Sequence, residues 1–196
     1  MALKGLRGFR FVSLTKDDEI STDYEKEITK LIGARSIKIT PKASSAELYG
    51  DDQLLESNSA IGAIDVEIDL AGLPLPIRAK LLGNNYENGV LIESKSDKPP
   101  EIAFGFLAAK SKDGDRMVWL TKGKAEPVGD ESKTQEDKIS YQTQKMKFKF
   151  MPRVSDGRYK ITVDTNEEGA PSALEFFTVD FLKEGKKKVT VEKKNE

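Results

Sequence analysis

The stretch that most constrains the fold runs from Ala63 to Leu70, where acidic residues alternate with apolar ones. Apolar residues at every second position predict a β-strand with one buried and one solvent-facing side. The solvent-facing side carries three carboxylates in a row, Asp65, Glu67 and Asp69. Because like charges repel and acidic residues form strands poorly, this acidic row needs either a partner or a use outside its own strand.

A second alternating stretch, residues 139–151, carries the opposite charge. Three lysines occupy one side of this predicted strand at the same spacing: Lys145, Lys147 and Lys149. If the two strands pair, the rows can neutralise each other as cross-strand ion pairs, which stabilise a sheet modestly. If they do not pair, the carboxylates face some other surface or space. The residues alone leave both alternatives open.

Most of the chain reads as further short strands separated by turn signals such as Asn88-Gly89 and Asp156-Gly157. Pro74 to Leu82 predicts a helix, and a second helix is expected to open at Ala170-Pro171-Ser172 and to run through Phe177 and Phe181. We therefore predict a mainly β fold, a β-sandwich or barrel of about eight to ten strands with one or two short flanking α-helices. Residues 1–185 form one domain, and the Lys-rich tail 186–196 is expected to be a short strand or partly disordered.

Residues 50–62 are predicted to form a long loop between two strands of a hairpin. Hairpin loops usually have about 2–5 residues, and long loops on a rigid sheet tend to carry function. The candidate contact residues in this loop are Asp51, Asp52, Gln53, Leu54, Leu55 and Glu56. We also expect Pro41 to end the strand before it, and residues 122–138 to form a long exposed loop.

Composition narrows the classes of function. The 196-residue chain has no cysteine and no histidine, which excludes disulfides and thiolate catalysis and removes the commonest general base and metal ligand. A net charge of -1 disfavours a general nucleic-acid binder. The N-terminus shows no signal peptide, and no apolar run is long enough for a membrane helix. We therefore expect a non-enzyme, without catalytic residues, cofactor or metal, that is made in the cytoplasm.

Five segments, which follow one another in a recognisable order, carry a resemblance to a known family. They are residues 46–52 (AELYGDD), 87–92 (ENGVLI), 102–106 (IAFGF), 116–123 (RMVWLTKG) and 156–160 (DGRYK). Together the sequence from about Leu3 to Leu182 resembles the major tail tube proteins of long-tailed, non-contractile phages and of related prophages in Gram-positive bacteria. The Lys-rich end is less typical of that family.

The resemblance implies a homo-oligomer, in which hexameric rings stack into the tube that delivers DNA to the host. The protein would belong to the virion tail, with tape measure, tail terminator and tail initiator proteins as partners, and DNA would pass through the lumen without specific binding. Inner strands of each subunit would join around the lumen, and the loop 50–62 would reach the neighbouring ring. The acidic row of 63–70 would then line the lumen, or form a registry ladder with the lysines, or do both.

Two other classes of function compete with this one. A β-sandwich carbohydrate-binding or adhesin module would need exposed aromatic side chains, but most aromatic residues here sit at apolar strand positions, and the single Trp119 is predicted to lie in the core. A carboxylate-based hydrolase would need two particular acids to meet, which a sequence this rich in acids does not specify. Both are ranked below the tube subunit.

Overall fold

The computed structural model describes residues 3–50, 53–127, 129 and 143–186, with Leu3, 43–50 and 53–61 described by their backbone alone. This part of the chain is mainly β, as predicted, with eleven strands and three short helices. The strands are β1 (Leu3–Asp17), β2 (Thr22–Tyr24), β3 (Thr29–Lys30), β4 (Ala34–Gly50), β5 (Gln53–Leu70), β6 (Asn85–Glu87), β7 (Val90–Ile92), β8 (Ile102–Lys110), β9 (Asp115–Ala125), β10 (Gln144–Phe150) and β11 (Lys160–Asp164). The helices are α1 (Leu75–Leu82), α2 (Ala173–Phe176) and α3 (Val179–Glu184).

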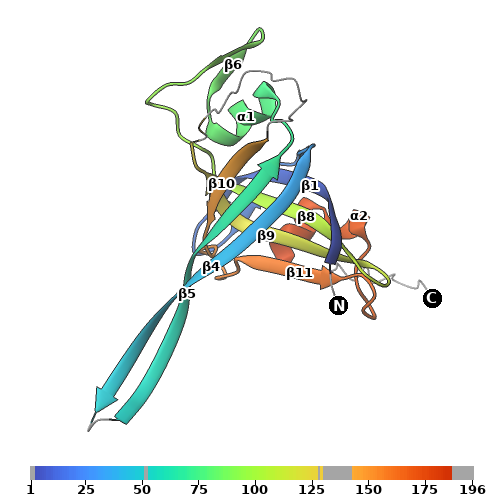
Figure 1. Cartoon of the computed structure of the whole chain (residues 1–196). Coiled ribbons are helices and arrows are strands. Elements are labelled where there is room, and N and C mark those ends of the chain that lie inside the picture. Colours follow the sequence, from blue (N-terminus) through green and yellow to red (C-terminus); the bar gives the residue numbers. More distant parts are fainter. Residues whose placement is uncertain (1–2, 51–52, 128, 130–142, 187–196) are drawn as a thin grey trace, which may run out of the picture.

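Nine of these strands form one antiparallel sheet in the order β2-β1-β8-β9-β10-β5-β4, with β11 paired to β9 and β3 paired to β1. The sheet curls strongly, and β4 and β5 run on past it as a projecting hairpin (Figure 1). Strands β6 and β7 make a separate two-stranded sheet. Within the described residues β1 and β4 do not pair, so the curled sheet stays open along one seam.

The inner side of the sheet holds the main core. Apolar residues of β5 and β10 alternate into it as predicted, and all are almost completely buried: Ile64, Val66, Ile68, Met146, Phe148 and Phe150. A second core lies on the other side of β1, β8 and β9, where α2 and α3 cover the sheet. The predicted core residue Trp119 lies there, and its indole Nε1 donates to the carbonyl oxygen of Phe176 at 3.0 Å.

Helix α1 confirms the prediction for its segment. Pro74 precedes the first turn, and Gly83 ends the helix in the left-handed conformation with φ of 71°. The predicted Asn88-Gly89 turn joins β6 to β7 with positive φ at both residues. The predicted second helix is instead two short ones: α2 ends at Phe176 with Phe177 as its C-cap, and the side chain of Thr178 caps the start of α3. In the described residues no helix is both long and apolar enough to cross a membrane.

Three predictions about loops need correction. Pro41 does not end its strand, because β4 is an edge strand with an irregularity between Pro41 and Ala43, and an edge tolerates the missing N–H. The predicted loop 50–62 is largely strand, since β5 begins at Gln53 and pairs with β4 along its length. Residues 122–125 belong to β9 rather than to an exposed loop.

Parts of the predictions fall outside the described residues. Residues 130–138 of the predicted exposed loop and residues 139–142 of the predicted strand lie there, and β10 begins at Gln144. Most of the Lys-rich tail, residues 187–196, lies there as well. These predictions therefore stay predictions.

Candidate functional site

The acidic and basic rows lie on neighbouring strands, in register. Strands β5 and β10 pair antiparallel, and the pairing sets three lysines opposite three acids: Lys145 opposite Asp69, Lys147 opposite Glu67, and Lys149 opposite Asp65. The closest of these contacts is 3.9 Å, from Lys147 Nζ to Glu67 Oε1, with both side chains more than half exposed. Of the two arrangements that the sequence left open, the structure contains the paired one.

The acidic row has lysines on its other side too. Strand β4 places Lys38 opposite Glu67, and Lys42 Nζ lies 2.6 Å from Asp65 Oδ2. The hydrogen bond with Lys42 lowers the pKa of Asp65, and the charges of Lys149 and Lys147 add to this effect. The acids therefore lie between the lysine row of β10 and two lysines of β4, Lys38 and Lys42.

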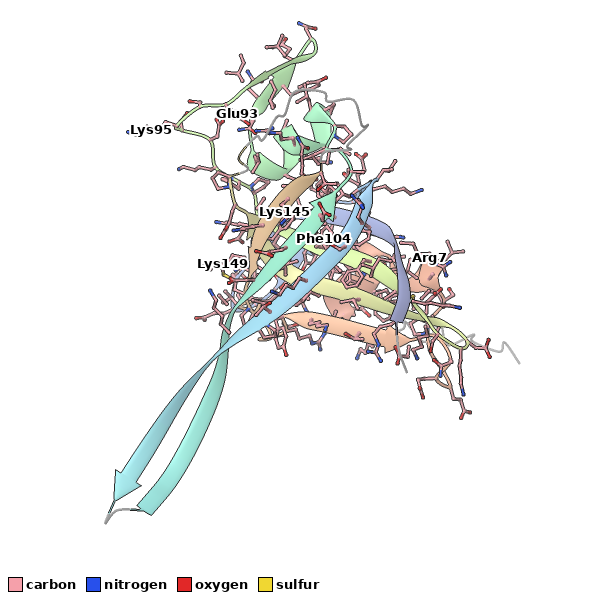
Figure 2. All side chains as sticks on the ribbon, viewed as in Figure 1. Arg7, Glu93, Lys95, Phe104, Lys145 and Lys149 are labelled. Carbon is pink, nitrogen blue, oxygen red and sulfur yellow. The ribbon has the colours of Figure 1, made fainter. Side chains whose placement is uncertain are left out.

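We call this surface the charged face, and it spans four neighbouring strands of the sheet. Figure 2 shows Lys145 and Lys149 along β10, and Lys124 of β9 lies opposite Lys149 in turn. Its members are Lys38, Lys42, Asp65, Glu67, Asp69, Lys124, Lys145, Lys147 and Lys149. Six lysines and three acids make it a mosaic rather than an anionic wall.

A variant at the centre of the charged face tests whether its rows interact. Lys147→Glu places a glutamate opposite Glu67, and we expect it to lower the free energy of unfolding by about 0.5 kcal/mol, because exposed cross-strand pairs contribute little. The double variant that also carries Glu67→Lys should recover most of this loss. Urea denaturation measures both, with Lys160→Glu on β11 as an exposed control. Equal free energies of unfolding for the single and double variants would show that the rows do not interact.

The hairpin of β4 and β5 continues this surface away from the body (Figure 1). The pairing of its two strands reaches Gly50 opposite Gln53, with irregularities between Pro41 and Ala43 and between Leu48 and Tyr49. At about 3.3 Å per residue, the part beyond residue 43 extends the hairpin by roughly 25 Å. Of the six predicted contact residues, Gln53 to Glu56 lie in β5, whereas Asp51 and Asp52 lie outside the described residues.

The outer edge of β4 is the second notable feature. Strand β4 is seventeen residues long and lies at one end of the strand order. Its outward backbone groups therefore pair with no strand in the described part of the chain. Long exposed edges of this kind template pairing with another chain unless they are covered. Pro41 and the irregularity beside it interrupt the edge but leave most of it available.

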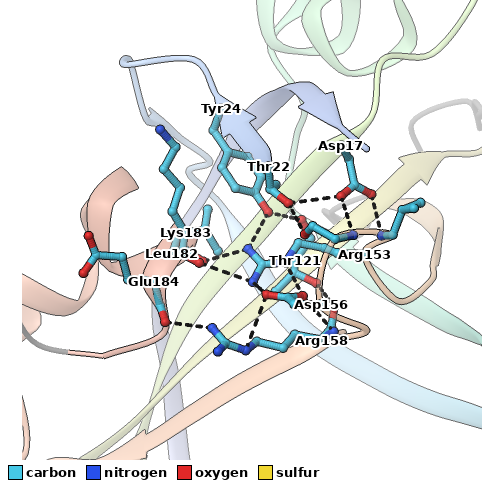
Figure 3. Close-up of polar contacts among 12 residues, drawn as sticks. Asp17, Thr22, Tyr24, Thr121, Arg153, Asp156, Arg158, Leu182, Lys183 and Glu184 are labelled. Carbon is cyan, nitrogen blue, oxygen red and sulfur yellow. Dashed lines mark hydrogen bonds and ion pairs between the residues drawn. The ribbon is translucent and has the colours of Figure 1, made fainter. Parts of the chain in front are cut away.

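The structure also contains a buried polar network that the sequence did not predict (Figure 3). Asp17 accepts hydrogen bonds from Lys122 Nζ at 2.6 Å and from the backbone N of Val154 at 2.8 Å, and its side chain is 1% exposed. Burial alone would raise the pKa of Asp17, but these hydrogen bonds outweigh it and the pKa is lowered. The contacts join β1 and β9 to the turn after β10.

Arg153 is the centre of the second half of this network (Figure 3). Its fully buried guanidinium pairs with Asp156 and donates to the carbonyl oxygen of Leu182 at 3.0 Å. Arg158 donates to the carbonyl oxygen of Glu184 at 2.7 Å. Two arginines thus satisfy the last carbonyl groups of α3, where cations are favoured. No single segment signals the Asp17 half of this network, because Asp17 lies more than a hundred residues from both Lys122 and Val154 in the chain.

The described residues present two surfaces on which another chain could bind, the charged face and the outer edge of β4. No group of three or more acidic side chains among the described residues is placed to hold a metal ion. Comparisons with known proteins add no relative: no protein-family model matches the chain, and no curated protein matches it significantly.

Proposed function

We propose that this protein is a structural subunit that polymerises through its sheet edges into a tube, as the major tail tube proteins of long-tailed, non-contractile phages do. The observation that carries the proposal is the seventeen-residue edge strand β4, which continues into a projecting hairpin. In a monomer, so long an unpaired strand edge would favour aggregation. In a ring, the same edge pairs with a neighbouring copy and closure removes it.

In the proposed ring, neighbouring subunits contact each other at the open seam of each curled sheet. The sheet ends at β4 on one side of this seam, and the other side is β1 with its short partners β2 and β3. A neighbour that pairs with β4 extends the sheet from one subunit to the next, and repetition of this contact closes a ring. The projecting hairpin then reaches beyond its own ring. Six subunits per ring, and the tape measure, terminator and initiator proteins as partners, follow from the resemblance in sequence.

The charged face gives the proposed tube a wall with mixed charge. Lysines of β10 and β4 lie beside the acids, and two of the three carboxylates, Asp65 and Glu67, form ion pairs with them. DNA carries roughly one charge per 1.7 Å. A purely basic wall would hold DNA strongly by counterion release. The six lysines and three acids of the charged face leave a smaller net positive charge, and its attraction is largely screened beyond about 8 Å at physiological salt. Such a wall suits DNA that passes without specific binding.

Electron microscopy of the purified protein tests the proposal. We expect negatively stained samples to contain rings or tubes whose diameter stays constant. A variant in which Asn-Gly replaces residues 46–58 shortens the hairpin but keeps the body, and we expect it to form rings that do not stack. A wild-type protein that stays monomeric at every concentration, while binding glycans, would instead favour the carbohydrate-binding alternative. The buried Trp119 makes that outcome unexpected, since it cannot contribute to an aromatic platform.

A further inference from the structure

Strand β1 has an unpaired edge near its start. The short strand β3 covers the middle of this edge, and its contacts end with the hydrogen bond from the backbone N of Leu31 to the carbonyl oxygen of Phe9 at 2.9 Å. Gly33, with a φ of 89°, then turns the chain away into β4. From Leu3 to Gly8, the side of β1 that faces away from β8 therefore pairs with no strand in the described part of the chain.

A groove of about 370 Å³ lies at the point where β3 leaves β1. Its wall consists of residues 7–10 of β1 and residues 30–34. Ile32 in this wall is 75% exposed, so an apolar side chain of a partner can pack against it. The start of β1 runs along the side of the body, apart from the projecting hairpin of β4 and β5 (Figure 1). Its six residues of free edge accommodate an extended segment of about 20 Å.

Two cations in the groove lack an acidic partner in the described part of the chain. Arg10 of β1 lies directly opposite Lys30 of β3, and like charges in such a position destabilise a sheet. The Arg10 guanidinium lies 3.8 Å from the centre of the Phe177 ring, and burial lowers the pKa of Arg10. The third cation, Arg7, is already paired with Asp115. None of the described residues that line the groove is acidic, so nothing there offsets the repulsion between Arg10 and Lys30.

We propose that the free edge of β1 and this groove bind an extended acidic segment of a partner protein, which adds to the sheet as a further strand. Main-chain hydrogen bonds to the edge provide affinity, and side chains that reach Arg10, Lys30 and Ile32 provide specificity. A second copy of the chain is a poorer match, because the acidic part of its β5 is already paired on both sides over residues 64–70. One chain contains the whole site, so binding does not depend on the proposed tube.

Fluorescence anisotropy with labelled peptides tests the site on the full-length protein, after any tubes have been removed by sedimentation. The probe is an eight-residue peptide in which glutamate and valine alternate, and the control peptide has lysine in place of glutamate. We expect the glutamate peptide to bind at least about tenfold more tightly than the lysine peptide, and its affinity to fall with added salt. The same glutamate peptide with N-methylated backbone amides keeps its charge but donates no main-chain hydrogen bond, so it should not bind measurably.

One variant and its control locate the charge contact. Lys30→Glu should weaken binding of the glutamate peptide at least about tenfold, whereas Lys160→Glu on β11 should change it less than about twofold. Because Lys30→Glu places an acid opposite Arg10, it should melt no earlier than the wild-type protein, which circular dichroism measures. Hydrogen exchange locates the backbone contact, since the bound peptide should slow exchange of the amides from Leu3 to Gly8.

Three results would overturn this inference. Equal binding of the N-methylated peptide would show that no strand is added. Slower exchange along β4 without any change from Leu3 to Gly8 would place the peptide at the other open edge of the sheet. Slower exchange from Leu3 to Gly8 on self-association alone, without peptide, would assign the edge to a second copy of the chain.

Discussion

Replacement of Arg153 by methionine is expected to lower the free energy of unfolding by about 3 kcal/mol, because loss of one partner of a buried ion pair leaves the other uncompensated. The Arg153 side chain is fully buried, whereas its partner Asp156 is 28% exposed and can be partly rehydrated. Methionine keeps much of the volume but donates no hydrogen bond. The carbonyl oxygen of Leu182 at the end of α3 then loses its donor.

Urea denaturation measures this loss, and Arg116→Met is the matched control. Arg116 also pairs with an aspartate, Asp164, through two hydrogen bonds of 2.8 and 2.9 Å, but its side chain is 42% exposed. Exposed pairs contribute about 1 kcal/mol or less, so the control should lose far less stability. Similar losses of stability in the two variants would show that burial does not determine how much these ion pairs contribute to the free energy of unfolding.

Hydrogen exchange should show where the Arg153 variant loosens first. Amides of α3 should exchange faster than those of β5 and β10, since Arg153 and Arg158 bind the last carbonyl groups of that helix. The charged face lies mainly on β4, β5 and β10, and its protection should change little. Uniform loss of protection across the sheet would mean that the network supports the whole body and not only the C-terminal helices.

The sequence predicted the charged face because burial on one side of a strand leaves a period-two pattern. Apolar residues at Ile64, Val66 and Ile68 identify the inner side of β5, and the same reasoning places the lysines of β10 outside. Which strand pairs with which is a tertiary property. The period of each row shows that pairing would match opposite charges, but only the order β9-β10-β5-β4 shows that lysines flank the acids on both sides.

The sequence predicts a loop where the structure has the outer part of the hairpin, because these residues lack the alternation of apolar and polar side chains. Polar residues such as Asn58 and Ser59 resemble a loop because they do not alternate with apolar ones. Pro41 was misread for a related reason, since the rule that proline ends a strand applies to strands with neighbours on both sides. At an edge, its missing N–H leaves nothing unpaired.

The buried network was missed because pairings over long sequence separations leave no local signal. Lys122 resembled an exposed loop residue among polar neighbours, yet it lies against Asp17 with its side chain only 9% exposed. Long charged side chains are rarely buried without a partner. The partner here comes from the first strand of the chain, which sequence spacing does not indicate.

Replacement of Trp119 by alanine should lower the free energy of unfolding by about 3–5 kcal/mol, the usual range for truncating a buried aromatic. Trp119 is 0% exposed, and a Cβ atom on Gly105 would come within 2.8 Å of its ring. Backbone therefore packs directly against the indole, and no side chain at position 105 can fill the space it leaves. The carbonyl oxygen of Phe176 in α2 also loses its donor.

Leu174→Ala on α2 is the control for this variant, because Leu174 is 89% exposed and its truncation should change the free energy of unfolding by less than about 0.5 kcal/mol. Trp119 belongs to the outer core under α2 and α3, whereas the apolar residues of β5 and β10 belong to the inner core. If the two cores are independent, the folded Trp119 variant keeps the edge of β4 intact. It should therefore still assemble below its lowered Tm, and assembly lost at temperatures where circular dichroism shows a folded sheet would place α2 and α3 in the subunit contact.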